Sequence, residues 1–314
     1  MLQELNKNST IDQIQQCAQL GAFYYKCPID LLQAIEQAKS LFSNDLSKFT
    51  SNSNLRGYLS FGSESGSNAF ESKEAYSIGY DAEYKNQSIH HTLDACNIWP
   101  NDSIQKYQSH LFNQLSEIAL EIVGLLSSSL GFTKEYLQDY CRKGHEISLL
   151  RLFHYNSIEK TRQLKNNSEK ITGSSEHTDW GFLTLIIAQE ERKGLEICNN
   201  DEWFPIPPKT GHLIVNLGDY FSLLTRNTYS SPLHRVVLDE FNDRYSYVFF
   251  FYPDYNSQIP DLTHLKSLQN SQQKMSILEN QTREPVDTRE AMGNRCFGDW
   301  IKDKWTQVSR KGYS

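Results

Sequence analysis

Long apolar segments are missing from this chain. No run of about eighteen consecutive apolar residues occurs in its 314 residues, and a helix that spans a membrane needs such a run. The stretch from Met1 to Lys7 also lacks the apolar core of a secretory signal. We therefore expect a protein with no membrane partner and a cytoplasmic location.

An excess of positive charge is absent as well. The formal net charge is -7, and the isoelectric point is about 5.7. Nucleic acids and anionic membrane surfaces both require a basic footprint on the protein. The charge balance therefore argues against either partner.

The chain has no C-x-x-C pair. Its six cysteines are scattered at positions 17, 27, 96, 141, 198 and 296. This pattern favours free thiols in a reducing compartment over a disulfide framework or a zinc site.

A nucleophile elbow is missing too. The stretch Gly62-Ser63-Glu64-Ser65-Gly66 resembles G-x-S-x-G, but its central residue is Glu64 rather than serine. The motif therefore does not support a serine hydrolase.

A candidate metal-binding pattern is present in the second half of the chain. His177 and Asp179 are two residues apart, so on a β-strand they point to the same side while Thr178 points away. His234 supplies a second imidazole. Two histidines and one carboxylate form the facial ligand set of non-haem Fe(II) oxygenases. An isolated His-x-Asp pair is a weak signal, because such pairs also occur in solvated loops.

The context strengthens this interpretation. Asp179 leads into Trp180-Gly181-Phe182-Leu183-Thr184-Leu185-Ile186, and the chain continues with the following motifs: Gly194-Leu195-Glu196-Ile197, Trp203, Pro207-Pro208, Asn216-Leu217-Gly218-Asp219, His234-Arg235-Val236 and Arg244-Tyr245-Ser246. In this order and spacing the chain resembles the iron- and 2-oxoglutarate-dependent dioxygenase superfamily, in the branch with isopenicillin N synthase and the plant flavonoid and hormone oxygenases. The resemblance implies an α+β fold with a double-stranded β-helix, or jelly-roll, core and an N-terminal helical region packed around it.

Arg244 and Ser246 form the second diagnostic pair. By strand alternation they share a face, where a guanidinium and a hydroxyl can meet one carboxylate. The alternative is an arginine that reaches solvent from a strand edge. The resemblance implies that the pair binds the distal carboxylate of 2-oxoglutarate, together with Tyr155. In the same segment Phe153 replaces the asparagine usual in the family, so we expect that contact to be lost or substituted.

The resemblance also implies the reaction. Fe(II), 2-oxoglutarate and O₂ are expected, with ascorbate as a stimulant, and the products would be succinate, CO₂ and a hydroxylated small molecule of specialised metabolism. Three alternatives stay open: an isopenicillin N synthase-type oxidase that does not use 2-oxoglutarate; a desaturase, cyclase or epimerase; and a jelly-roll binding protein with a vestigial site. The candidate substrate-contacting residues are Phe153, Trp180, Arg192 and Arg226.

The spacing of apolar residues and the positions of helix-capping and turn-forming residues predict the organisation of the chain. We expect a mostly helical region over 1–140, the catalytic core over 141–260 and a helical tail over 261–314, all in one structural domain. The first hundred residues are predicted as helices around one short strand at 21–25, with a loop at 51–68. A helix capped by Asp30 is predicted over 31–42, and one capped by Asp102 or Ser103 through Leu130. The aperiodic stretch 156–175 is predicted to be a mobile loop that is either a lid or a surface insertion.

Overall fold

The computed structural model describes residues 2–18, 20–50, 56–65, 69–80, 95–142, 146–164, 170–225, 227–258 and 295–311. Among these residues no helix is long and apolar enough to cross a membrane.

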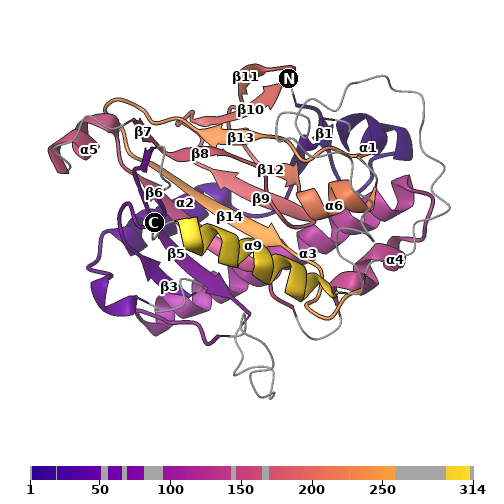
Figure 1. Cartoon of the computed structure of the whole chain (residues 1–314), viewed down its shortest axis with the longest axis horizontal. Helices are drawn as coiled ribbons and strands as arrows, with labels where there is room; N and C mark the ends of the chain where they lie inside the picture. The colour runs from indigo at the N-terminus through magenta and orange to yellow at the C-terminus, as the bar shows by residue number, and fades with distance from the viewer. Residues whose placement is uncertain are drawn as a thin grey trace.

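Two facing β-sheets form the centre of the molecule (Figure 1). The strands of the larger sheet are, in spatial order, β1 (Glu4–Leu5), β2 (Ala22–Lys26), β12 (His212–Leu217), β9 (Leu183–Ala188), β14 (Arg244–Phe251), β6 (Leu149–Tyr155), β5 (Lys73–Gly79) and β3 (Gly57–Leu59). The smaller sheet contains β11 (Glu202–Pro205), β10 (Leu195–Asn199), β13 (His234–Val236) and β8 (Ser174–His177). A parallel pair, β4 (Phe70–Glu71) and β7 (Ile171–Thr172), lies beside them. This is the expected jelly-roll core of an α+β fold.

Strand alternation gives the larger sheet two different faces. The outer face carries side chains such as Leu152, Tyr247 and Phe249, which join the main core with helices α2 and α3. These helices and the remaining ones are α1 (Ile11–Ala18), α2 (Leu31–Phe42), η1 (Ser47–Phe49), α3 (Asp102–Ser129), α4 (Lys134–Gln138), η3 (Asp139–Cys141), α5 (Ile158–Leu164), α6 (Asp219–Leu224) and α9 (Phe297–Lys311). The inner face, with Ile186 and Ile214, packs against Leu195 and Ile197 of the smaller sheet.

Local sequence explains where the two main helices begin. Asp30 caps α2 by accepting a hydrogen bond from the Gln33 amide at 2.9 Å. Helix α3 is capped by Asn101, which accepts from the Ile104 amide at 3.0 Å, so the prediction of Asp102 or Ser103 was wrong by one or two residues. Asparagine and aspartate are equivalent N-caps, and composition alone does not separate adjacent candidates.

The prediction of one short strand in the first hundred residues was wrong. Strands β1 to β5 all lie in this region, and β3 falls inside the segment 51–68 that was predicted to be loop. Strand β5 pairs with β6 over seven residues and thereby joins the larger sheet. Its inner face carries Lys73, Ala75 and Ser77, and on its outer face only Tyr76 and Ile78 are apolar because Glu74 precedes them, so the alternating apolar pattern is too short to be recognised.

The segment 156–175 also differs from its prediction as a loop. It contains helix α5, strand β7 and the start of β8. Helix α5 is held by polar contacts: the Ser157 amide donates to Asp243 at 2.8 Å, and Arg162 pairs with Glu240 at 2.8 Å. These contacts come from residues far along the chain, so the local sequence shows no apolar period.

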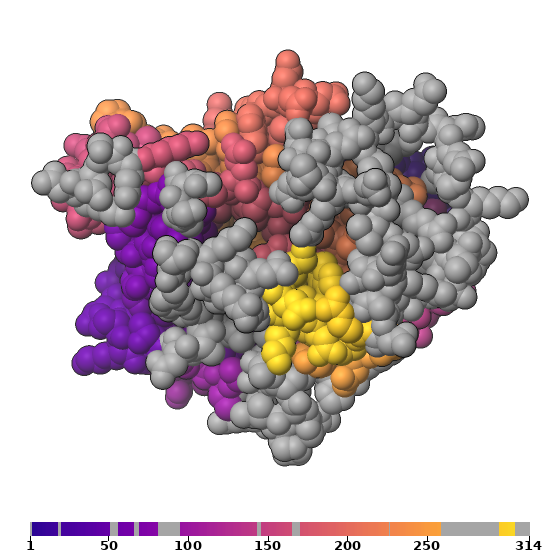
Figure 2. Space-filling model, viewed as in Figure 1, coloured from indigo at the N-terminus to yellow at the C-terminus, as the bar shows by residue number. Residues whose placement is uncertain are grey.

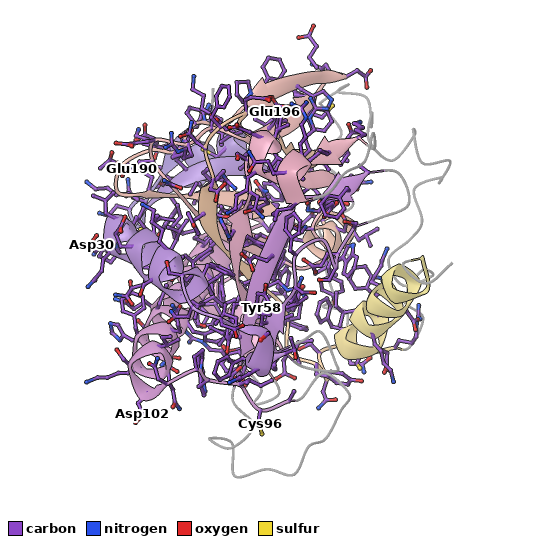
Figure 3. All side chains as sticks on the ribbon, turned by 90° about the vertical axis from the view of Figure 1, so that its left-hand side faces the viewer. Asp30, Tyr58, Cys96, Asp102, Glu190 and Glu196 are labelled. Atoms are coloured by element: carbon purple, nitrogen blue, oxygen red, sulfur yellow. The ribbon has the colours of Figure 1, made fainter. Side chains whose placement is uncertain are left out.

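Helix α9 packs back onto the end of the larger sheet. Phe297 and Ile301 are fully buried, and the Phe297 ring lies 4.7 Å from that of Tyr220 and 5.7 Å from that of Tyr252. The helix lies at the surface of the face shown in Figure 2 and on the opposite side of the molecule from α2, which begins after Asp30 (Figure 3). Residues 259–294 of the predicted tail lie outside the described part of the chain.

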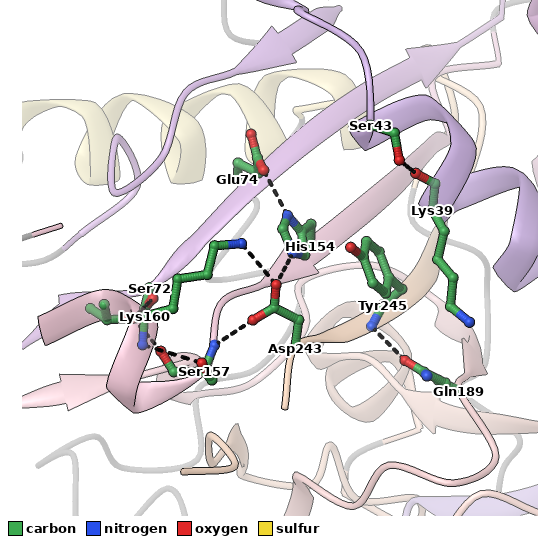
Figure 4. A network of polar contacts seen from close by, with 11 residues as sticks. Lys39, Ser43, Ser72, Glu74, His154, Ser157, Lys160, Gln189, Asp243 and Tyr245 are labelled. Atoms are coloured by element: carbon green, nitrogen blue, oxygen red, sulfur yellow. Dashed lines mark hydrogen bonds and ion pairs between the residues drawn. The ribbon is translucent and has the colours of Figure 1, made fainter. Parts of the chain in front are cut away.

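A buried histidine on the outer face links β6 with β5 and with Asp243, the residue before β14 (Figure 4). His154 contacts Glu74 through Nδ1 at 2.7 Å and Asp243 through Nε2 at 2.9 Å, and Lys160 joins Asp243 at 2.8 Å. Burial alone would lower the pKa of His154, but the two carboxylates outweigh burial and raise it. The same contacts lower the pKa of Glu74 and Asp243 despite their burial.

We expect this network to make stability depend on pH. Because the pKa of His154 is raised, its stabilising contribution is complete below the unfolded-state value of 6.5 and is lost as pH rises through the native value. Urea unfolding of the metal-free protein from pH 6 to 9 should show a difference between wild type and His154→Gln that shrinks as pH rises. The exposed His110→Gln change on α3 is the control. A difference that stays constant over this range would contradict the assignment.

Candidate metal centre

Three side chains meet at one point between the two sheets. His177 at the end of β8, Asp179 two residues later and His234 at the start of β13 each offer a ligand atom, and these atoms all lie within 4.8 Å of one another. His177 Nε2 lies 4.0 Å from Asp179 Oδ1, and His234 Nε2 lies 3.7 Å from Asp179 Oδ2. The structure therefore brings together the three residues predicted from the sequence as metal ligands.

Backbone hydrogen bonds fix the tautomer of both histidines. His177 Nδ1 lies 2.7 Å from the Ser175 carbonyl, and His234 Nδ1 lies 3.0 Å from the Pro232 carbonyl. A carbonyl oxygen only accepts, so each Nδ1 carries the proton and each Nε2 keeps its lone pair. Such support of the second ring nitrogen is usual for histidines that bind a metal.

Asp179 is positioned by a close contact between two backbone segments. The Asp219 amide donates to the Asp179 carbonyl at 2.7 Å, and the Gly218 amide donates to the Phe182 carbonyl at 2.9 Å. A Cβ on Gly218 would lie 2.1 Å from the Gly181 carbonyl oxygen, so only glycine permits this approach. Asp219 thus supports the turn, and its carboxylate also accepts from the Thr178 hydroxyl at 3.0 Å.

The electrostatics of the triad suit a cation. The His177 side chain is 43% exposed, but desolvation at the triad and the neighbouring His234 lower its pKa to about 4, with Asp179 acting in the opposite direction. His177 is therefore neutral near pH 7, which is the state that binds a metal. Among the described residues Asp179 Oδ2 is buried and has no hydrogen-bond donor, and a buried carboxylate oxygen of this kind requires a cation or a donor.

A second group of polar side chains lies on the inner face of the larger sheet. In the antiparallel register Arg244 is opposite Tyr155, and Ser246 is opposite Phe153 and Ala188. All of these residues are buried, and the Arg244 guanidinium carbon lies 5.0 Å from the centre of the Tyr155 ring. The structure therefore brings together the three residues predicted to bind 2-oxoglutarate.

Arg244 and Ser246 have unused hydrogen-bonding atoms. Arg244 Nε and Nη1 and the Ser246 hydroxyl are buried and have no partner among the described residues. Burial lowers the pKa of Arg244, against the influence of Tyr155. The alternative of a solvent-exposed arginine at a strand edge is excluded. An anionic ligand would strongly stabilise a guanidinium that is buried in this way.

The candidate substrate-contacting residues lie in different places. Phe153 is buried on the inner face beside Tyr155, with ring centres 5.7 Å apart. Trp180 is half-buried and packs against the main core, and Arg192 lies in the turn after β9, where its charge contributes to the low pKa of Asp239. Arg226 lies outside the described residues. For all four a contact with substrate stays a prediction.

Sequence reasoning missed a group of charged residues next to the triad. We call Glu64, Glu71, Lys73 and Arg151 the interior charge cluster. Lys73 Nζ lies 2.7 Å from Glu71 and 3.8 Å from Glu64, and Arg151 Nη1 donates to Glu64 at 2.6 Å. Arg151, Phe153 and Tyr155 alternate along β6, so the period-2 pattern is the signal that could have placed Arg151 inside.

Comparison with known proteins agrees with this geometry. Residues 147–253 match the model of the 2OG-Fe(II) oxygenase superfamily. A 2-oxoglutarate-dependent dioxygenase from Didymella fabae is 29% identical over 262 residues, which are 76% of this chain and 71% of that protein. Clavatol oxidase from Penicillium crustosum is 32% identical over 168 residues, and the match spans 51% of this chain and about half, 48%, of that protein. The crystal structure of a full-length Neurospora crassa protein in complex with alpha-KG superposes with a TM-score of 0.65 at 25% identity, over 80% of this chain and 81% of that one.

The chain belongs to the 2OG-Fe(II) oxygenase superfamily. It is an enzyme of the Fe(II)- and 2-oxoglutarate-dependent dioxygenase class, and the His-Asp-His triad is retained. A non-catalytic binding protein is thereby set aside.

Metal binding should stabilise the fold through the triad. Mn(II) replaces Fe(II) in the test because it does not oxidise in air. At a free concentration one hundred times its Kd, a ligand adds about 2.7 kcal/mol to the stability of the state that binds it. We expect the midpoint of thermal unfolding to rise with Mn(II) in wild type and to be unaffected in His234→Ala. His212→Ala is the matched control, since His212 Nδ1 also contacts a carbonyl two residues earlier, at 2.8 Å. An equal response of the two variants would argue against His234 as a ligand.

Proposed function

We propose that His177, Asp179 and His234 hold Fe(II), that Arg244, Ser246 and Tyr155 bind the distal carboxylate of 2-oxoglutarate, and that the enzyme hydroxylates an unactivated C–H bond of a small molecule. The observation that carries the proposal is the buried Arg244–Ser246 pair, whose donors have no partner among the described residues. In a dry interior these donors are complementary to one carboxylate.

The residues present fit both groups. Two imidazoles with free Nε2 atoms and one buried carboxylate are the donor set that non-haem Fe(II) prefers. When bound, the metal with 2-oxoglutarate and O₂ supplies the oxidising power, and 2-oxoglutarate leaves as succinate and CO₂. The protein groups contribute position and charge: Arg244 neutralises the distal carboxylate, and Ser246 and Tyr155 orient it.

A small molecule fits the site better than a macromolecule. The triad lies between two sheets, with Asp179 and His234 buried. The relatives point the same way, because the Neurospora crassa protein has been crystallised with thymine and with 5-formyluracil, and one fungal relative is named clavatol oxidase. We infer a substrate from specialised metabolism on this basis, and a cytoplasmic location remains part of the proposal.

Replacing Arg244 should weaken 2-oxoglutarate binding without removing the metal. Hydrogen bonds to a charged group contribute about 1.5–3 kcal/mol, so Arg244→Ala should raise the Kd for 2-oxoglutarate roughly 10- to 150-fold. Ser246→Ala, which removes one neutral hydroxyl, should have a smaller effect. The measurement is calorimetric titration of 2-oxoglutarate into Mn(II)-loaded protein.

The control is Arg162→Ala, which removes an exposed arginine in an ion pair with Glu240. Succinate release under air should fall in parallel with binding. An unchanged affinity of Arg244→Ala for 2-oxoglutarate would contradict the assignment. An isopenicillin N synthase-type oxidase would instead oxidise its substrate without releasing succinate. Product mass separates hydroxylation, which adds one oxygen atom, from desaturation, cyclisation or epimerisation.

A further inference from the structure

The interior charge cluster adjoins the metal centre. Glu71 Oε1 accepts from the Ser175 amide at 2.8 Å, and the Ser175 carbonyl accepts from His177 Nδ1 at 2.7 Å. Lys73 Nζ lies 3.5 Å from the hydroxyl of Ser174, three residues before His177. Two consecutive hydrogen bonds therefore connect the cluster with a candidate metal ligand.

Both cations of the cluster belong to the sheet interior. Arg151 on β6 and Lys73 on β5 are 5% and 8% exposed. Lys73 also lies over the ring of Phe153, 5.2 Å from its centre. Because both strands are paired along their full length, the positions of these two cations are fixed by the sheet.

Glu64 is held differently. It lies in a turn, outside any strand, and its side chain is 25% exposed. One carboxylate oxygen accepts from Arg151 at 2.6 Å, while the other lies 3.8 Å from Lys73. Burial would raise the pKa of Glu64, but the charges of Arg151 and Lys73 outweigh burial and lower it, with a smaller contribution from His177. A carboxylate from a surface turn thus occupies a site built by two buried cations.

We propose that this site is the polar subsite for substrate, and that a substrate carboxylate replaces Glu64 at Arg151 and Lys73. The inference rests on the proposed function and specifies its substrate class: a small molecule that carries a carboxylate. Arg151 offers a planar fork that matches a carboxylate. Glu64 pairs with Arg151 when substrate is absent and moves out to solvent when the substrate binds, while Glu71, 2.7 Å from Lys73 Nζ, stays paired with that cation.

Charge balance supports a carboxylate over a neutral group. Removing the Glu64 carboxylate takes an anion away from Arg151, a cation only 5% exposed, which is strongly unfavourable. A neutral substrate would therefore leave Glu64 in place and meet an ion pair already complete. An anionic substrate exchanges one carboxylate for another, so the cluster keeps its net charge.

The test measures binding to the full chain loaded with Mn(II) and saturated with 2-oxoglutarate, so that the Arg244 site is filled. The probes are three acids and their primary amides: phenylacetate, 4-phenylbutanoate and octanoate, with phenylacetamide, 4-phenylbutanamide and octanamide. We expect wild type to bind at least one acid more tightly than its amide. Glu64→Gln should bind that acid roughly tenfold more tightly than wild type, because the internal carboxylate no longer competes. Arg151→Gln should lose the preference for acid.

A second binding measurement, with acetate, and two control variants complete the test. Glu64→Ala should gain a saturable site for acetate that wild type lacks and that the Glu64→Ala/Arg151→Gln double variant loses. The controls are Glu36→Gln and Arg162→Gln, which remove members of exposed ion pairs. If no acid is preferred over its amide in wild type or in Glu64→Gln, or if Glu64→Ala gains no acetate site, the inference is overturned.

The failure of this inference is distinguishable from failure of the proposed function. Titration of 2-oxoglutarate into each Mn(II)-loaded variant reports on the Arg244 site separately. If the protein binds 2-oxoglutarate but prefers no acid over its amide, only the inference about the substrate carboxylate is contradicted. Loss of 2-oxoglutarate binding in wild type would remove the proposed function.

Discussion

The burial of the Arg244 guanidinium is the physical constraint on which this site depends. Arg244 lies on the inner face of the larger sheet with two nitrogens unpartnered among the described residues. Taking a charge out of water costs several kcal/mol unless an opposite charge offsets it. The register of β14 against β6 and β9 holds the guanidinium there. The fold therefore keeps a position that an anionic cosubstrate stabilises.

The two sheets divide the chemistry between them. The larger sheet supplies Arg244, Ser246 and Tyr155, and the smaller sheet supplies His177 and His234. His177 and His234 are opposite each other in the pairing of β8 with β13. Asp179 follows β8 and is fixed by the backbone contact at Gly181 and Gly218. Strand register thus sets the positions of His177, His234 and the cosubstrate residues, and the backbone contact at Gly181 and Gly218 sets that of Asp179.

Several features of the fold and site could be predicted from the sequence. The helix over 31–42 and its cap followed from a local rhythm and one aspartate, both of which act within a few residues. The grouping of His177 with Asp179, and of Arg244 with Ser246, followed from strand alternation. The meeting of these two groups with His234 was implied by the family resemblance, since no local rule connects residues so far apart.

Other features depended on contacts that the sequence does not display. Strand β5 was missed because only Tyr76 and Ile78 give its outer face an apolar alternation, and helix α5 was missed because distant charged residues hold it. The pairing of Glu64 with Arg151 joins residues 87 positions apart. Glu71, Lys73, Glu64 and Arg151 form the cluster that adjoins the metal centre, so the missed strand and the missed ion pair fall beside the site.

The most direct test of the account is a crystal structure of the Mn(II) complex with 2-oxoglutarate. The account predicts metal bound by His177, Asp179 and His234, with the distal carboxylate of 2-oxoglutarate on Arg244 and Ser246. A metal held by other residues, or a 2-oxoglutarate carboxylate that does not touch Arg244, would contradict it.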